Sequence, residues 1–269
     1  TWGDPAVVAA RRRWTPASEA TTREATEALL AAAELRPGLH VLDLASGTGN
    51  PALSIAAAIA PDGRVFATDI VPGLLAYADE RARGSGLANF STRQASADSL
   101  PFPDASFDLL TCRFGVMFFP DVPRALQKAR RALKIGGRVV FAAWGSTAQP
   151  FFQLTFGILL RHVDASYAAE AHSPFKFGQP GTLFEALRSA GFAAVHEESR
   201  EIALRFPGTV EEFWHYMLES AALAHQLFES IAPGKRERFI AEAHAALRPY
   251  ADGPSVNIPA AIVLASATR

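Results

Sequence analysis

The chain has 269 residues, a length that fits one α/β core with an elaboration better than two full domains. Hydrophobic residues make up 49% and charged residues 20%, so the composition supports a buried core and excludes a disordered chain. The formal net charge is −1, without the basic excess that neutralises phosphates. We therefore expect no nucleic-acid partner.

The single cysteine, Cys112, excludes an internal disulfide and a cysteine-rich metal site. The seven histidines include no pair at metal-ligand spacing, so we expect no metal. No apolar run is long enough to cross a bilayer, and the first residues lack the apolar core of a signal peptide. The simplest expectation is a cytoplasmic protein without integral membrane association.

The first half alternates strand-like and helix-like segments, which is typical of a parallel sheet with helices on both faces. In chain order we predict a helix over 18–35, a strand over 40–45, a helix over 51–59, a strand over 64–69, a helix over 72–83, strands over 90–95 and 107–113, a helix over 121–133 and a strand over 138–144. Proline in the first turn of helix 51–59 and Asp121 as an N-cap support two of the helix starts.

The second half contains longer helical stretches. We predict a helix over 151–169, an aromatic loop over 171–180, a helix over 181–190, a strand near 194–204, helices over 209–231 and 235–247, and a closing strand over 256–267. The division is an N-terminal helical segment (1–36), a core (37–148) and the rest of the core sheet (149–269), with a cap inserted at about 149–180 and 207–250. The predicted fold is a Rossmann-like doubly wound α/β sheet, mostly parallel with an antiparallel last strand, plus this helical cap.

The segment DLASGTGN at 43–50 leaves a predicted strand, turns through Gly47 and Gly49, and opens a helix. Asp69 ends the next strand twenty residues after Gly49, where an acid can accept hydrogen bonds from ribose hydroxyls. This combination indicates an adenosine-containing cofactor, against the alternative of a tight turn without a ligand. Ala52 occupies the third position of a dinucleotide fingerprint, where alanine is tolerated, so the turn alone does not choose the cofactor.

Four segments together identify the cofactor by resemblance: VLDLASGTGN (41–50), ATDI (67–70), LPFPDASFDLLTCRFG (100–115) and ALKIGGRVVFAAW (132–144). They resemble the class I S-adenosylmethionine (SAM)-dependent methyltransferases, closest to the ubiquinone/menaquinone C-methyltransferase-like group (methyltransferase type 11). The resemblance implies SAM as cofactor and S-adenosylhomocysteine as product.

The resemblance also implies the cofactor-binding residues. The methionine end of SAM would lie along Asp43 and the turn 45–49, the ribose on Asp69, and the adenine between Ile70 and Leu75. The family's adenine-binding Asp is replaced by Ser96, so Ser96 or nearby Asp98 must serve. The complete implied set is Asp43, Ala45, Ser46, Gly47, Thr48, Gly49, Asp69, Ile70, Leu75, Ser96, Ala97, Asp98, Cys112, Arg113 and Phe114, the last three beside the transferred methyl group.

The residues that contact the acceptor follow less directly from the sequence. The candidates are Arg113 at a strand end and His215 and Tyr216 in the cap, and no catalytic base is assigned. The run 114–119 fits either a pocket wall or plain core, and Cys112 fits packing better than a nucleophile. The clusters 11–13 and 130–131 are interpreted as solvated helix faces.

The segments expected to form the acceptor pocket are rich in aromatic residues, which favours a small hydrophobic or aromatic acceptor: a quinone-like ring, an isoprenoid or a secondary metabolite. The residues concerned are Phe118, Phe119, Trp144, Phe151, Phe152, Phe156, Phe175, Phe177 and Trp214. The alternatives are a SAM-binding cyclase or isomerase, a non-catalytic partner protein of the same fold, and a nicotinamide dehydrogenase. The sequence does not distinguish O, N and C acceptors or define the oligomeric state.

Overall fold

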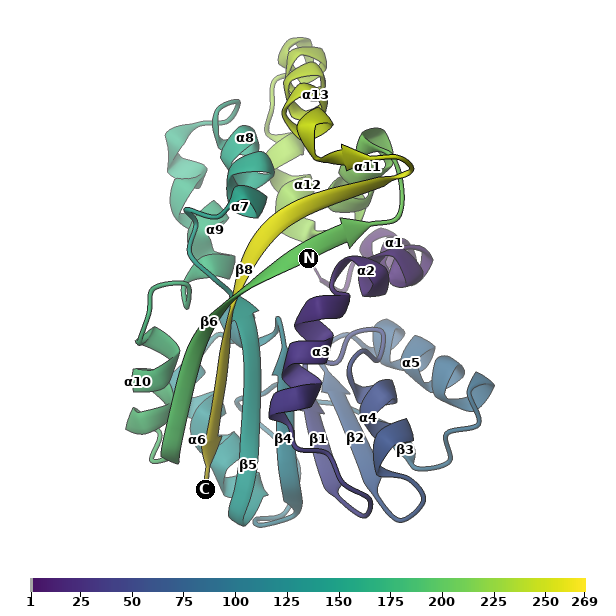
Figure 1. Cartoon of the computed structure of the whole chain (residues 1–269), viewed down its shortest axis with the longest axis vertical. Helices are drawn as coiled ribbons and strands as arrows, with labels where there is room; N and C mark the ends of the chain where they lie inside the picture. Colours follow the sequence, from purple (N-terminus) through teal and green to yellow (C-terminus); the bar gives the residue numbers. More distant parts are fainter. Residues whose placement is uncertain (1) are drawn as a thin grey trace.

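One mixed eight-stranded sheet organises the computed structural model, which describes residues 2–269 (Figure 1). The strands are β1 (His40–Leu44), β2 (Arg64–Asp69), β3 (Phe90–Gln94), β4 (Phe107–Arg113), β5 (Leu133–Trp144), β6 (Ala193–Phe206), β7 (Ala251–Asp252) and β8 (Ser255–Thr268). Their order is β3-β2-β1-β4-β5-β8-β6, with β7 paired to β8 outside this path. Strands β1 to β5 pair in parallel, whereas β8 lies antiparallel between β5 and β6. The predicted fold, with its antiparallel last strand, is confirmed.

Helices cover both faces of this sheet. They are α1 (Pro5–Arg13), α2 (Thr15–Thr21), α3 (Arg23–Ala32), α4 (Ala52–Ile59), α5 (Pro72–Gly84), α6 (Val122–Ala132), α7 (Pro150–Leu154), α8 (Phe156–Leu160), α9 (Ala168–His172), α10 (Thr182–Ser189), α11 (Val210–Ser220), α12 (Ala222–Glu229) and α13 (Pro233–Leu247). Buried residues of α3, α4 and α5 pack on one face, and those of α6 and α10 pack on the other. None of the helices within residues 2–269 combines the length and apolar character needed to cross a membrane.

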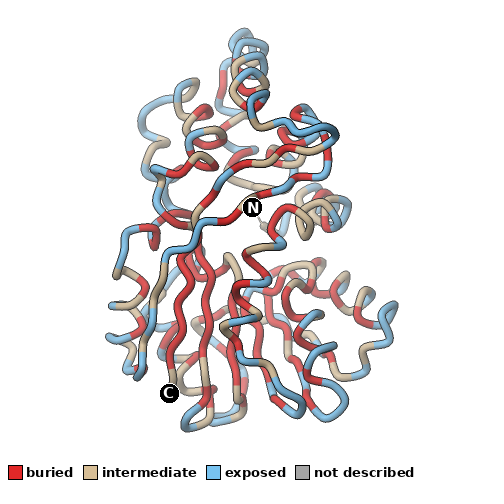
Figure 2. Tube along the Cα trace, in the orientation of Figure 1, coloured by how far each residue is buried: buried red, intermediate tan, exposed pale blue. Residues whose placement is uncertain are grey.

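Alternation along the central strands divides the core between the two faces. Val41 packs with the first cluster and its neighbour Leu42 with the second, because successive strand side chains point to opposite sides. Buried residues are concentrated along the central strands in Figure 2. The first cluster continues through Phe206 into the cap residues Phe213 and Phe239, so the cap packs as an extension of the core.

The cap is built on two long strands. β6 and β8 pair from Ala193↔Thr268 to Phe206↔Val256 and extend beyond the carboxyl edge of the parallel strands (Figure 1). In the sequence, helices α11 to α13 fall between β6 and β8. Helix α7 packs against β8 and α13, and α8 packs against α12 and α13. The cap therefore stands over the edge at which parallel strands present ligand-binding loops.

Several predicted helices are interrupted in the structure. The N-terminal helix expected over 18–35 is split at Thr22 into α2 and α3. The helix expected over 151–169 breaks at Thr155, whose φ of −119° and ψ of −89° lie outside the helical region. The helix expected over 209–231 breaks at Ala221, which has extended backbone angles. These breaks let short helices curve around the cavity, a tertiary constraint that helical periodicity does not reveal.

The helix that precedes β5 ends earlier than the glycines suggest. The Asp121 side chain caps α6 as predicted by accepting from the Arg124 N–H at 2.9 Å. The helix stops at Ala132, and Gly136, with φ of +76°, belongs to an irregular start of β5 rather than to a helix end. The strand predicted over 138–144 is therefore extended at its amino end.

Candidate active site

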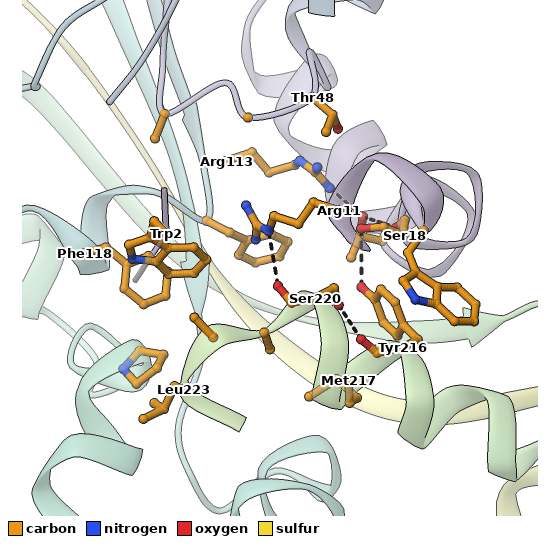
Figure 3. Close-up of a pocket in the computed structure, with 18 of the residues that line it drawn as sticks. Trp2, Arg11, Ser18, Thr48, Arg113, Phe118, Tyr216, Met217, Ser220 and Leu223 are labelled. Carbon is orange, nitrogen blue, oxygen red and sulfur yellow. Dashed lines mark hydrogen bonds between the residues drawn. The ribbon is translucent and has the colours of Figure 1, made fainter. Parts of the chain in front are cut away.

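Two adjoining pockets open at the carboxyl edge of β1, β2 and β4, beneath α1 and α11. Trp2, Arg11, Ala45, Phe114 and Phe118 line both of them. We name the Asp69 pocket for the side lined also by Asp69, Ile70, Leu74, Ser96 and Ala97. We name the Tyr216 pocket for the side lined also by Ser46, Gly47, Thr48, Arg113, Trp144 and Tyr216 (Figure 3).

The turn after β1 forms the floor where the two pockets meet. Ala45 and Gly47 both have a φ of +53°, the left-handed region that glycine adopts most easily. A Cβ added to Gly47 would meet no atom within 4 Å, so this glycine faces open space. A Cβ on Gly49 would lie 2.9 Å from the Leu53 Cδ1 atom, so Gly49 serves close helix packing and does not line the cavity.

Asp69 connects the end of β2 to this turn. One carboxylate oxygen accepts from the Gly47 N–H at 2.9 Å, and the other accepts from the Val71 N–H at 2.9 Å. Each carboxylate oxygen has a second acceptor direction that these bonds do not use. The side chain is 8% exposed and lines its pocket, a geometry that can accept hydrogen bonds from two adjacent hydroxyls of a ligand.

Asp43 lies beneath the turn, and its side chain does not line either pocket. Its Oδ1 atom accepts from the Thr111 hydroxyl at 2.6 Å, whereas Oδ2 is buried without a hydrogen-bond partner among the described residues. Complete burial raises the pKa of Asp43 to about 6, although the hydrogen bond from Thr111 opposes this shift. The expected contact with the methionine end of SAM would thus have to be made from below the turn.

Arg113 and Phe114 extend from the end of β4 into the Tyr216 pocket. The Arg113 guanidinium donates to the Thr22 hydroxyl at 2.5 Å and to the Asn50 carbonyl at 3.3 Å, while its Nε atom is buried without a partner among residues 2–269. Burial lowers the pKa of Arg113. Phe114, with φ of +56°, stacks on Trp144 at a ring-centroid distance of 4.1 Å. The run 114–119 therefore supplies both pocket wall, at Phe114 and Phe118, and buried core, at Val116 and Met117.

The cap and the N-terminal helices complete the Tyr216 pocket. The Tyr216 hydroxyl donates to the Ser18 Oγ atom at 3.3 Å, which connects α11 to α2. Figure 3 shows Arg11 and Arg113 entering the cavity opposite Tyr216, Met217 and Ser220 of the cap. Tyr216 is the cap candidate that reaches the cavity.

The structure does not place the candidate His215 at either pocket. His215 is exposed and lines neither pocket, because adjacent residues of α11 point about 100° apart and Tyr216 faces inward. The same geometry corrects Leu75, which is buried in α5 while its neighbour Leu74 lines the Asp69 pocket. Of the two residues proposed to replace the adenine-binding acid, Ser96 lines that pocket and Asp98 does not.

Cys112 is also not beside the cavity. It is fully buried in the second core cluster, since it points to the opposite side of β4 from its two neighbours Thr111 and Arg113. Burial raises the pKa of the Cys112 thiol well above its ordinary value, which keeps it protonated. The packing interpretation of this residue is supported, and its implied place beside the methyl group is wrong.

Among the lining residues that the sequence analysis missed, Trp2 and Arg11 are the two that line both pockets. The basic run 11–13 behaves as a solvated face at Arg12, which pairs with Glu80 at 2.8 Å, and at Arg13, which pairs with Glu219. Arg11 is half-buried and lines both pockets. No local pattern distinguishes it from its neighbours, because only the docking of α1 across the cavity turns one arginine inward.

The aromatic residues predicted to surround the acceptor fall into two groups. Phe118, Trp144, Phe151 and Phe156 line the Tyr216 pocket, and Phe119 lines the Asp69 pocket. The others are buried behind this wall: Phe152, Phe175, Phe177 and Trp214. The Tyr216 pocket is therefore walled by rings on one side and by the polar turn on the other.

Comparison with known proteins places this architecture in context. The sequence matches the model of the ubiE/COQ5 methyltransferase family over residues 23–203. It is 35% identical over 179 residues to the ubiquinone/menaquinone biosynthesis C-methyltransferase UbiE of Xanthomonas campestris pv. campestris, covering 62% of this chain and 71% of that protein. The YcgJ protein from Bacillus subtilis has a similar fold, with a TM-score of 0.59, 20% identity and coverage of 92% of this chain and 98% of that one.

The fold is also shared with an enzyme of another class. The [4+2]-cyclase SpnF superimposes with a TM-score of 0.55 at 21% identity, covering 91% of this chain and 80% of the cyclase. At such identities the likeness concerns the fold alone.

Proposed function

This chain belongs to the ubiE/COQ5 methyltransferase family and is a SAM-dependent enzyme, and from that premise we propose that it methylates a small, ring-containing hydrophobic acceptor in the Tyr216 pocket. The observation that carries the proposal is the meeting of two unlike pockets over one glycine turn. One has a carboxylate, Asp69, and the other has a wall of aromatic rings.

The Asp69 pocket fits the nucleoside part of SAM. Both oxygens of Asp69 keep a free acceptor direction for the two ribose hydroxyls. Ile70, which is 53% exposed, and Leu74 provide apolar surface for a purine ring, and Ser96 offers a hydroxyl to its polar edge. The open space above Gly47 leaves room for the rest of the cofactor to reach the Tyr216 pocket.

The Tyr216 pocket fits the acceptor. Phe114 and Trp144, stacked at 4.1 Å, form a flat apolar surface beside the turn, and Phe151 extends it with a centroid distance of 4.8 Å from Trp144. Flat aromatic walls favour a planar ring over a flexible chain because stacking adds to area burial. A quinone-like or other aromatic acceptor therefore suits this pocket better than an isoprenoid.

When bound, SAM would supply a methyl group on a sulfonium, with S-adenosylhomocysteine as the leaving group on transfer to the acceptor. The residues of this chain contribute alignment and the exclusion of water. The ring wall orients the acceptor, Trp2 and Phe118 cover the opening in an edge contact at 5.2 Å, and the cap helix α11 closes the other side. A hydroxyl or ring-carbon acceptor must also lose a proton as it is methylated, and no residue of the pocket is assigned to accept that proton.

The test begins with isothermal titration of the protein with SAM, S-adenosylhomocysteine and NADH. We expect micromolar binding of both sulfur compounds and none of NADH. Formation of S-adenosylhomocysteine is then measured with a panel of reduced naphthoquinones, simple phenols and aliphatic alcohols of similar size.

The outcomes separate the proposal from its alternatives. Turnover of aromatic acceptors in preference to aliphatic ones supports the proposal. Conversion of a substrate without S-adenosylhomocysteine formation would instead identify a cyclase or isomerase, and absence of binding to either sulfur compound would indicate a non-catalytic partner protein. A cytoplasmic location, suggested by the single cysteine, remains part of the proposal and is tested by cell fractionation.

A further inference from the structure

The Tyr216 pocket contains two arginines, Arg11 and Arg113, and among residues 2–269 no aspartate or glutamate lines it. The carboxylates whose charge acts on these arginines lie outside this pocket. Asp69 lines the adjoining pocket, and Asp43 lies beneath the turn. Glu219 accepts from Arg13 and from the Trp14 indole. A pocket lined by two cations and no anion has a marked preference for a negatively charged ligand.

The two arginines differ in how much of their hydrogen-bonding capacity the protein uses. Arg113 is fixed between Thr22 and Asn50 near the glycine turn. Arg11 donates only from Nε, to the Ser220 carbonyl at 3.2 Å, and makes no ion pair among the described residues. Its Cζ atom lies over the Trp2 ring, 4.7 Å from the centroid, and Figure 3 shows the side chain among the residues that line the cavity. Its terminal nitrogens donate no hydrogen bond among the described residues.

Arg11 uses little of its hydrogen-bonding capacity. It is half-buried and donates one side-chain hydrogen bond among the described residues, and its partial loss of hydration lowers its pKa. Its neighbours Arg12 and Arg13 are both paired with glutamates at the surface. The one unpaired arginine of α1 is thus the one that faces the pocket.

Resting on the proposed function, we infer that the acceptor is a ring compound with an ionised oxygen, a carboxylate or an acidic enol or phenol, and that Arg11 binds this oxygen. A guanidinium presents its terminal N–H groups in a planar fork that suits either kind of oxygen. Arg11 is then a residue that determines which acceptors this enzyme selects.

Although Arg11 lines both pockets, two observations favour the acceptor over the cofactor as its ligand. Its one side-chain hydrogen bond among the described residues goes to Ser220 at the end of α11, on the cap side of the cavity, whereas Arg113 is bonded beside the turn that would receive the methionine end of SAM. In addition, α1 and α11 lie outside residues 23–203, so the roof of the acceptor pocket is built from segments beyond the part that matches the family.

The experiment compares planar ligands that differ in charge. 2-Naphthoate and 2-naphthamide have similar shapes but only the first is anionic, and 2-hydroxy-1,4-naphthoquinone provides an ionised enol beside neutral 1,4-naphthoquinone. Each is titrated at neutral pH into the protein with and without saturating S-adenosylhomocysteine. We expect at least one of the two anions to bind roughly tenfold or more tightly than its neutral counterpart. A preference for 2-naphthoate would indicate that the acceptor carries a carboxylate, and a preference for 2-hydroxy-1,4-naphthoquinone would indicate an ionised enol.

Three variants assign the preference to a residue. Arg11→Met should remove the preference for the anion: its affinity for the anionic ligand should fall roughly tenfold or more, while its affinity for the neutral ligand should stay the same or rise. Arg11→Lys should restore part of it, because the charge is kept and the planar fork is lost. Arg12→Met is the matched control on the same helix and should bind every ligand as the unmodified protein does, since Arg12 is exposed and lines neither pocket.

Equal binding of anionic and neutral ligands by the unmodified protein would overturn the inference. So would an anion preference that survives in Arg11→Met, or a loss of SAM affinity in that variant without any change toward the naphthyl ligands. The last result would mean that Arg11 binds the carboxylate of the cofactor. Failure of the proposed function is distinct, because it appears as absence of SAM binding to the unmodified protein.

If Arg11→Met fails to fold, the salt dependence of the unmodified protein replaces it as the test. Binding of 2-naphthoate should weaken with increasing salt while binding of 2-naphthamide stays constant. Parallel behaviour of the two ligands would contradict a charged contact.

Discussion

Replacing Asp43 by asparagine should stabilise the ligand-free protein at neutral pH. The carboxyl group is completely buried, and its Oδ2 atom has no hydrogen-bond partner among the described residues. Burial raises the pKa of Asp43 to about 6 from an ordinary value of 3.8. The folded protein therefore binds this proton more tightly than the unfolded chain does.

The sign of the pH dependence follows from linkage. A raised pKa contributes stability that is fully present below pH 3.8 and is lost as the pH rises to about 6. Above that pH the buried ion costs the folded state about 3 kcal/mol relative to the protonated form. An amide of the same shape avoids this cost but loses part of the Thr111 hydrogen bond, so Asp43→Asn should gain roughly 2 kcal/mol at pH 7.5.

The assay is thermal unfolding followed by circular dichroism between pH 4.5 and pH 7.5. For a chain of this size the expected gain raises Tm by about 5 °C at the upper end of the range. At the lower end the two proteins should converge, since the carboxyl group of the unmodified protein is then protonated when folded.

Asp108→Asn provides a control of opposite sign. Burial raises the pKa of Asp108, but hydrogen bonds from Lys134 and from the His40 N–H outweigh it and lower the pKa overall. This variant should lose stability at neutral pH. A Tm difference between Asp43→Asn and the unmodified protein that does not change with pH would refute the argument from the buried charge.

Three further changes test the site. Asp69→Ala should weaken SAM binding roughly tenfold or more in a titration, because two ribose contacts and the Gly47 N–H anchor are lost, and unchanged affinity would remove Asp69 from the site. His215→Ala should leave SAM binding and S-adenosylhomocysteine formation unchanged, since His215 is exposed outside both pockets, and a clear loss of turnover would restore it as a substrate contact. Cys112 should resist a thiol reagent such as DTNB until the protein unfolds, and rapid labelling of the folded protein would contradict its complete burial.

The fold was predictable because its signals are local. The parallel strands are short apolar runs separated by helices, and the turn at 43–50 combines glycines with an acid at Asp69 in a spacing that one βαβ unit requires. The N-cap of α6 at Asp121 was predictable for the same reason, since its hydrogen-bond partner, the Arg124 N–H, is only three residues away. Six residues that line the Asp69 pocket could therefore be named before the structure: Ala45, Asp69, Ile70, Ser96, Ala97 and Phe114.

The acceptor side could not be predicted in the same way. Its roof joins α1 to α11, where Arg11 meets Ser220 across a separation of 209 residues, and no local pattern records such a contact. The rotation of α11 decided between His215 and Tyr216, and that rotation is set by the packing of Phe213 and Met217 into the core. The sequence by itself determined the strands and the turn, because hydrophobic alternation and turn formation act between near neighbours, and its resemblance to a known family identified the cofactor. Only the tertiary structure decided which side chains face the acceptor, because burial of a helix face depends on distant elements.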